Sequence, residues 1–171
     1  MTTTINKPAA SGTQKLAGKY LTFRLAEASY GIQVLQVREI IRRTEITAVP
    51  RMPAYVRGVI NLRGKIIPVI DMRLRFGFAE NRDTDLTCII VVQVTSPAGK
   101  AMHTGLIVDG VEEVANLSAA DIEETPDFGV NVASDYILGL AKVKGAVKTL
   151  LNIERVLTTD ALNQIERVVS K

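Results

Sequence analysis

The side chains with which catalysis or metal binding usually begins are scarce in this sequence. The only histidine is His103, and the only cysteine, Cys88, lies within the apolar run CIIVV. One histidine does not make a His-based metal cluster or a Ser-His-Asp triad, and no glycine-rich phosphate-binding motif occurs. The acidic pairs Glu112-Glu113 and Glu123-Glu124 are typical of solvated faces. We therefore expect no enzyme, no metal site and no cofactor.

Charge is divided between two regions of the chain. Basic residues outnumber acidic ones between Arg38 and Arg75, whereas residues 105–136 are acidic and contain no Lys or Arg. Opposite poles on one small body favour protein partners over nucleic acid, because a protein that tracks phosphates does not usually carry such an acidic block. An RNA-binding basic barrel remains as an alternative, although no basic strand is interleaved with aromatic residues. A self-associating structural module is a third possibility.

The elements that position these charges are predicted to be mainly strands. Val and Ile dominate residues 20–157, and apolar residues alternate with polar ones from residue 21 to residue 25. The clearest hairpin runs from Tyr55 to Asp71 around Gly64, and Asp71 has the chemistry of an N-cap for a short helix. The segment GIQVLQVREII indicates a helical turn that leads into a strand.

The two ends of the chain are expected to differ from this body. Residues 1–17 lack an apolar signal core and are expected to be a flexible leader. Residues 158–171 are predicted to form a C-terminal helix, because Leu162, Ile165 and Val169 make one apolar stripe. No stretch reaches the roughly 20 apolar residues that cross a bilayer. A single cysteine within an apolar run favours a reduced, cytoplasmic compartment.

An internal repeat determines the expected fold class. Residues 55–76 align without a gap on residues 136–157, so that Arg63 matches Lys144 and Asp71 matches Asn152. Further upstream, Glu39 matches Glu113. We expect a mainly β protein of two SH3-like, five-stranded β-barrels packed together, with short helices. The first barrel should span roughly residues 20–85 and the second roughly 86–157, and strands may cross between them.

Several strings across residues 18–160 resemble the CheW family of bacterial chemotaxis coupling proteins. They are YGIQVLQVREI, PAYVRGVINLRGKIIPVIDMRLRFG, IVDGV, TPDF, and YILGLAKVKG followed by LLNIERVL. The string RGVINLRG followed by IIPVIDMR is long and particular. The resemblance implies a CheW-like domain over residues 18–160 and a non-catalytic adaptor that couples chemoreceptor cytoplasmic tips to the histidine kinase CheA. It also implies a cytoplasmic protein recruited to membrane-associated receptor arrays, without insertion into the membrane and without nucleic acid.

The resemblance also implies where the partners bind. A groove of the first barrel would take the helical hairpin of the receptor, and its residues here are Val37, Glu39, Ile40, Gly58, Asn61, Leu62 and Arg63. Arg63 presents a donor fork suited to a carboxylate, and Glu39 is a candidate partner that would pre-shape the groove. The alternative is that both are solvated surface charges. Gly58 is better explained by a backbone requirement than by a contact.

A second site, for the kinase, is implied at Phe128. This phenylalanine stands between Pro126-Asp127 and Gly129, which suits an exposed aromatic anchor. Packing in the core is the alternative for the same side chain.

Overall fold

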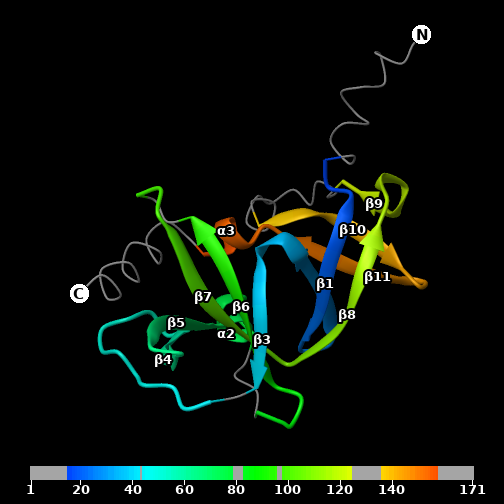
Figure 1. The fold of residues 1–171 in the computed structure, drawn as a ribbon. Coiled ribbons are helices and arrows are strands. Elements are labelled where there is room, and N and C mark those ends of the chain that lie inside the picture. Colours follow the sequence, from blue (N-terminus) through cyan, green and yellow to red (C-terminus); the bar gives the residue numbers. More distant parts are fainter. Residues whose placement is uncertain (1–14, 43, 79–82, 96–97, 125–135, 158–171) are drawn as a thin grey trace.

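The computed structural model describes residues 15–42, 44–78, 83–95, 98–124 and 136–157. These residues form two β-sheets with short helices between them (Figure 1). The expected fold class, mainly β with two packed barrels, is confirmed. Most of the expected leader and the whole expected C-terminal helix, residues 158–171, lie outside the described residues.

One sheet, which we call the first barrel, has five strands in the order β3-β6-β7-β5-β4. Its strands are β3 (Val37–Arg42), β4 (Val56–Leu62), β5 (Lys65–Asp71), β6 (Cys88–Thr95) and β7 (Ala101–Val108). A 3-10 turn, η1 (Val34–Gln36), leads into β3, as the sequence predicted. The interior of this barrel is aliphatic, and its buried residues are Ile60, Ile67, Val69, Ile89, Val91 and Ile107.

The other sheet, the second barrel, has six strands in the order β8-β1-β2-β11-β10-β9. Its strands are β1 (Gly18–Leu25), β2 (Ala28–Gln33), β8 (Gly110–Leu117), β9 (Ile122–Glu123), β10 (Ile137–Val143) and β11 (Ala146–Leu151). The turn η2 (Ala119–Asp121) precedes β9 and is closed by a capping box between Ser118 and Asp121. The buried interior residues are Tyr20, Ala115, Leu117, Ile122, Ala141, Val143 and Leu150.

The barrels do not follow a split of the chain near residue 85. The N-terminal hairpin β1-β2 completes the second barrel, and the hairpin β6-β7 completes the first. Each hairpin joins its barrel by parallel pairing, at Gly31 opposite Leu150 and at Gly105 opposite Val69. A Cβ at Gly105 would lie 2.8 Å from Ile89 Cγ2 and one at Gly31 would lie 3.0 Å from Leu150 Cδ2. A larger residue at either junction would therefore have to displace a packed side chain, and the approach is closer at Gly105.

The repeat read from the sequence is confirmed in detail. The turns of the two equivalent hairpins have the same backbone, with φ of 53° at Arg63 and 51° at Lys144, each followed by a positive-φ glycine. Each hairpin leads into a single helical turn, α2 (Met72–Arg75) or α3 (Ile153–Val156). The turns begin at Asp71 and Asn152, whose backbone N–H groups donate to Tyr55 and Tyr136 carbonyls at 2.7 Å.

A third apolar cluster lies between the two sheets and joins the barrels. It combines residues of β1, β2, β6, β7 and α3, so it contains parts of both sequence repeats. Its fully buried members include Phe23, Ile32, Ile90, Leu106 and Ile153. Burial of apolar area therefore contributes to the attraction between the barrels.

Candidate binding site

The end of the first barrel that holds the β4-β5 turn carries an ion pair between two predicted site residues. The two terminal nitrogens of Arg63, Nη1 and Nη2, donate to Oε1 and Oε2 of Glu39, each at 2.8 Å. Glu39 lies on the edge strand β3 and Arg63 on the turn beyond the opposite edge strand, so the pair spans the two edges of the sheet. The predicted partnership of Glu39 with Arg63 is confirmed, while a role in binding stays a prediction.

The pair is held at the surface with a defined geometry. The Arg63 side chain is 71% exposed and that of Glu39 is 28% exposed. The hydrogen bonds from Arg63, with its charge, lower the pKa of Glu39, and the same carboxylate raises the pKa of Arg63. Asn61 positions the turn, because its Oδ1 accepts the Gly64 N–H at 2.8 Å. The bidentate fork therefore presents a planar, charged surface of fixed orientation.

Two exposed apolar side chains occur on strands of this barrel, and only one of them was predicted. Ile40, on β3, is 45% exposed. Ile66, on β5, is 48% exposed. The sequence did not predict it as a site residue, because its exposure depends on the register of the hairpin. Val37 and Leu62 pack partly against the cores, so Ile40 and Ile66 are the exposed apolar residues of β3 and β5. Ile40 follows Glu39 directly in β3 and therefore lies on the alternate face of that strand.

Gly58 has a backbone role in this site. Its φ is +143°, and a Cβ there would lie 2.0 Å from the Thr47 carbonyl oxygen. The segment around Thr47 needs this approach, because Thr47 and Val59 exchange two backbone hydrogen bonds of 2.9 Å. Gly58 thus shapes the first barrel beneath the candidate site.

The same arrangement recurs on the second barrel. Lys144 Nζ lies 2.9 Å from Glu113 Oε1, at the positions equivalent to Arg63 and Glu39. The exposed apolar residues recur as well, with Val114 at the place of Ile40 and Val147 at the place of Ile66. The hollow beside this pair has a volume of about 270 Å³ and is lined by Glu113, Val114 and Lys144 among others.

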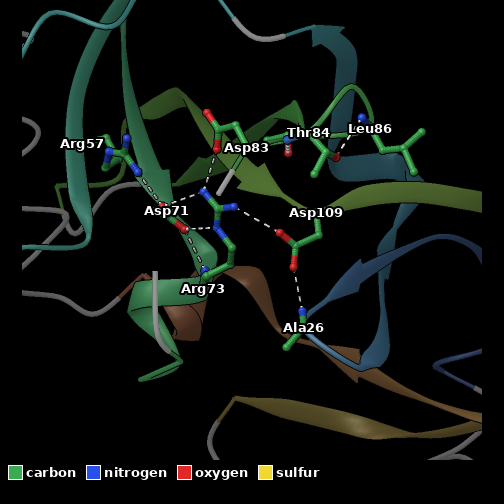
Figure 2. Close-up of polar contacts among 9 residues, drawn as sticks. Ala26, Arg57, Asp71, Arg73, Asp83, Thr84, Leu86 and Asp109 are labelled. Atoms are coloured by element: carbon green, nitrogen blue, oxygen red, sulfur yellow. Dashed lines mark hydrogen bonds and ion pairs between the residues drawn. The ribbon is translucent and has the colours of Figure 1, made fainter. Parts of the chain in front are cut away.

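A buried ionic cluster connects the two barrels (Figure 2). Arg73, only 1% exposed, donates to both oxygens of Asp71 at 3.0 Å and to Asp109 at 3.1 Å. Asp109 lies where the chain passes from β7 to β8, and its other oxygen accepts the Ala26 N–H at 2.7 Å. Asp109 therefore ties α2 of the first barrel to the β1-β2 turn of the second.

Electrostatics within this cluster keep its groups charged. Burial alone would raise the pKa of Asp71, but the hydrogen bonds and charge of Arg73, with the charge of Arg57, bring it below its ordinary value. Burial opposes the charge of Arg73, yet the surrounding carboxylates raise its pKa. The acids and the arginine therefore satisfy one another, which indicates a structural connection.

The remaining reactive residues are separate from one another. His103 lies on β7 and Cys88 begins β6, where burial raises the pKa of its thiol. Among the residues that the structure describes, no group of three His, Cys, Asp or Glu side chains could hold a metal ion. Phe128, the predicted kinase contact, lies outside the described residues.

Comparison with known proteins identifies the family. The model of the CheW-like domain matches residues 19–161. The chain belongs to the CheW family. It is 33% identical to the chemotaxis protein CheW of Klebsiella aerogenes over 90% of this chain and 93% of that relative. It is 34% identical to the CheW of Bacillus subtilis, over 81% and 84% of the two chains.

A solved CheW structure agrees with the fold. The crystal structure of the scaffolding protein TtCheW from Thermoanaerobacter tengcongensis matches with a TM-score of 0.74 and 33% identity, covering 85% of this chain and 95% of that one. The CheW family is a family of non-catalytic scaffolds, and the chain is a chemotaxis scaffold protein. The alternative of RNA binding receives no support from these relatives. None of the described helices is long and apolar enough to span a membrane.

Proposed function

We propose that this CheW-family protein couples the cytoplasmic tips of chemoreceptors to the histidine kinase CheA. One body binds both partners and so raises their effective concentration for each other, without turnover and without a cofactor. The protein acts in the cytoplasm and is recruited to membrane-associated receptor arrays through the receptor tips.

The observation that carries the receptor half of this proposal is the exposed surface around the Glu39-Arg63 pair. Ile40 and Ile66 are exposed aliphatic residues of the same barrel, and the bidentate ion pair presents charge in a fixed orientation. An amphipathic helix binds to such a surface through its apolar face, while charges at the rim determine its orientation. The helical hairpin of a receptor tip has this chemistry. Phe128 and its neighbours are proposed to contact the kinase.

The test is assembly from purified components with a charge reversal on each barrel. We expect Arg63→Asp to weaken binding of a soluble receptor-tip fragment at least about tenfold, because it repels Glu39 and removes the donor fork. Its Tm should change little, because exposed ion pairs contribute at most about 1 kcal/mol. Lys144→Asp, the same change at the equivalent place of the second barrel, should leave tip binding unchanged.

Two results would contradict the proposal. The first is failure of the wild-type protein to form a ternary assembly with receptor tip and kinase, measured by size-exclusion chromatography with light scattering. The second is equal weakening of tip binding by Arg63→Asp and Lys144→Asp, since the receptor site would then not be specific to the first barrel.

A further inference from the structure

Two cationic side chains and a histidine converge near the Glu39-Arg63 pair. Arg38 Nε, from β3, donates to Gln93 Oε1 of β6 at 3.0 Å, and His103 Nε2, from β7, lies 3.4 Å from the same oxygen. Lys65 begins β5 and lies close enough to act on His103 by its charge. Four strands thus bring Arg38, Lys65 and His103 to one end of the first barrel.

These cations have little negative charge around them. Glu39 is engaged at both oxygens by Arg63, and Gln93 offers only a neutral carbonyl. Within the part of the chain that the structure describes, neither Arg38 nor Lys65 forms an ion pair. Uncompensated cations on a surface attract an external anion.

The second barrel provides an internal comparison for this cluster. Through the register of the repeat, Arg38 corresponds to Glu112, Lys65 to Ala146 and His103 to Ser29. All three cationic positions are lost there, although the ion pair and the exposed apolar residues recur. Glu112 instead pairs with Lys148 at 2.9 Å. The cations therefore belong to the first barrel alone and are not required by the fold.

We propose that Arg38, Lys65 and His103 form a carboxylate-binding subsite that takes an acidic side chain of the receptor-tip helix. The inference rests on the proposed coupling function and names a chemical feature of its partner. The apolar face of the helix packs on exposed aliphatic residues of this barrel. A carboxylate on its flank meets Arg38 and Lys65 together with the imidazole of His103. Charge complementarity places the acidic helix on the first barrel and disfavours the second, where Glu112 would repel it.

The first arm of the test removes one cation at a time and measures the affinity for a soluble receptor-tip fragment by calorimetry. Lys65→Ala and Arg38→Gln should each weaken binding about two- to fivefold and reduce its salt dependence, as expected for one rim charge pair. Lys142→Ala is the matched control, because this exposed lysine lies at the equivalent end of the second barrel and should leave affinity unchanged. The Tm of each variant verifies that it is folded.

The second arm uses the titration of His103. Burial and the charges of Lys65 and Arg38 lower its pKa, and Glu39 opposes this shift, so the imidazole is mostly neutral at pH 7.5 in the free protein. A bound carboxylate favours the imidazolium, so binding takes up a proton. Affinity should rise about two- to fivefold between pH 7.5 and pH 5.5 in the wild-type protein. His103→Gln should remove this rise.

The outcomes separate the subsite from the coupling function. If the tip binds with equal affinity to Lys65→Ala, Arg38→Gln and wild type, and if His103→Gln keeps the wild-type pH profile, the subsite is wrong while coupling stands. If the wild-type protein binds no tip at any pH, the coupling function and the subsite are both overturned.

Discussion

The two barrels have one topology and two different ends. In each, a two-residue turn presents a cation to a glutamate on an edge strand, β3 or β8, and the same two strand positions carry exposed aliphatic residues. The first barrel adds a cluster of cations above an aliphatic interior that includes Ile67. The second has Lys148 at the place of Ile67, paired with Glu112. The two copies of the repeat thus share a backbone arrangement, while the charged side chains at their ends differ.

The helical turns after the two hairpins differ in the same way. Asp71 and Asn152 both cap their turns, so the backbone requirement is shared. Arg73, however, is buried among three carboxylates. Its equivalent Glu154 is exposed and accepts a hydrogen bond from the Thr95 N–H at 3.1 Å. The connection between the barrels therefore depends on charge at α2 and on apolar packing at α3.

The largest effect that would test this difference is expected at Arg73. Arg73→Ala should lower the free energy of unfolding by about 3–5 kcal/mol, because it leaves the buried Asp71 without its main partner. Glu154→Ala, the matched change, should cost about 1 kcal/mol or less. Urea denaturation of both variants measures the two values, and similar losses would show that the turns are equivalent after all.

The pH dependence of stability sharpens the same comparison. Since the folded pKa of Asp71 lies below its ordinary value, its contribution is present above about pH 4 and is lost as pH falls through the folded pKa. Without Arg73 that pKa rises, so the stability that Asp71 loses below about pH 4 should be smaller in Arg73→Ala than in the wild-type protein. If the stability of Arg73→Ala and of the wild-type protein fell equally below about pH 4 in urea denaturation, this role of Arg73 would be contradicted.

A smaller but still large effect is expected at Gly58. Gly58→Ala should cost about 3 kcal/mol, because its φ is +143° and the added Cβ would meet the Thr47 carbonyl at 2.0 Å. At the equivalent Gly139 the nearest backbone atom is the Glu123 carbonyl oxygen, at 2.9 Å, and the φ is not positive. Gly139→Ala should therefore cost only about 1–2 kcal/mol. A Gly58→Ala variant of wild-type stability would make Gly58 a contact residue instead.

The smallest effect is expected where the barrel interiors differ. Lys148→Ile should change the free energy of unfolding by less than about 1 kcal/mol, because an aliphatic residue fits this place in the first barrel and Glu112 keeps its bond from Ser29. Thermal and urea denaturation measure it. The converse change, Ile67→Lys, should be clearly destabilising. The residue equivalent to Glu112 in the first barrel is Arg38, which would repel the new lysine instead of pairing with it. Equal responses to the two exchanges would contradict the distinction between the ends.

Much of the site could be predicted because its cause is local. The alternation of apolar residues, the glycine of the hairpin and the N-cap at Asp71 each act within a few residues of chain. The Glu39-Arg63 partnership followed from the resemblance and from the geometry of guanidinium and carboxylate. The subsite around His103 could not be found in this way, because Arg38, Lys65 and His103 meet only through cross-strand register.

One local rule also gave an incomplete expectation. Pro68 has no N–H, which predicts an edge strand or a bulge. In the structure, β5 lies between β4 and β7, but its pairing with β7 begins only at Val69. Pro68 stands opposite Val59 at a position whose backbone nitrogen faces away from β4 and toward β7. The missing N–H therefore falls just before the first residue pair between β5 and β7.

The amino-acid sequence by itself determined the strands, the two hairpin turns, the caps and the fact of repetition, since these follow from residue types a few positions apart. Only the tertiary structure decided which hairpin completes which barrel. The hairpin β1-β2 of the first repeat joins the second barrel, and the hairpin β6-β7 of the second repeat joins the first barrel. Both join by parallel pairing, at Gly31 and Gly105. That choice depends on burial of the shared apolar core across distant parts of the chain, which no local pattern records.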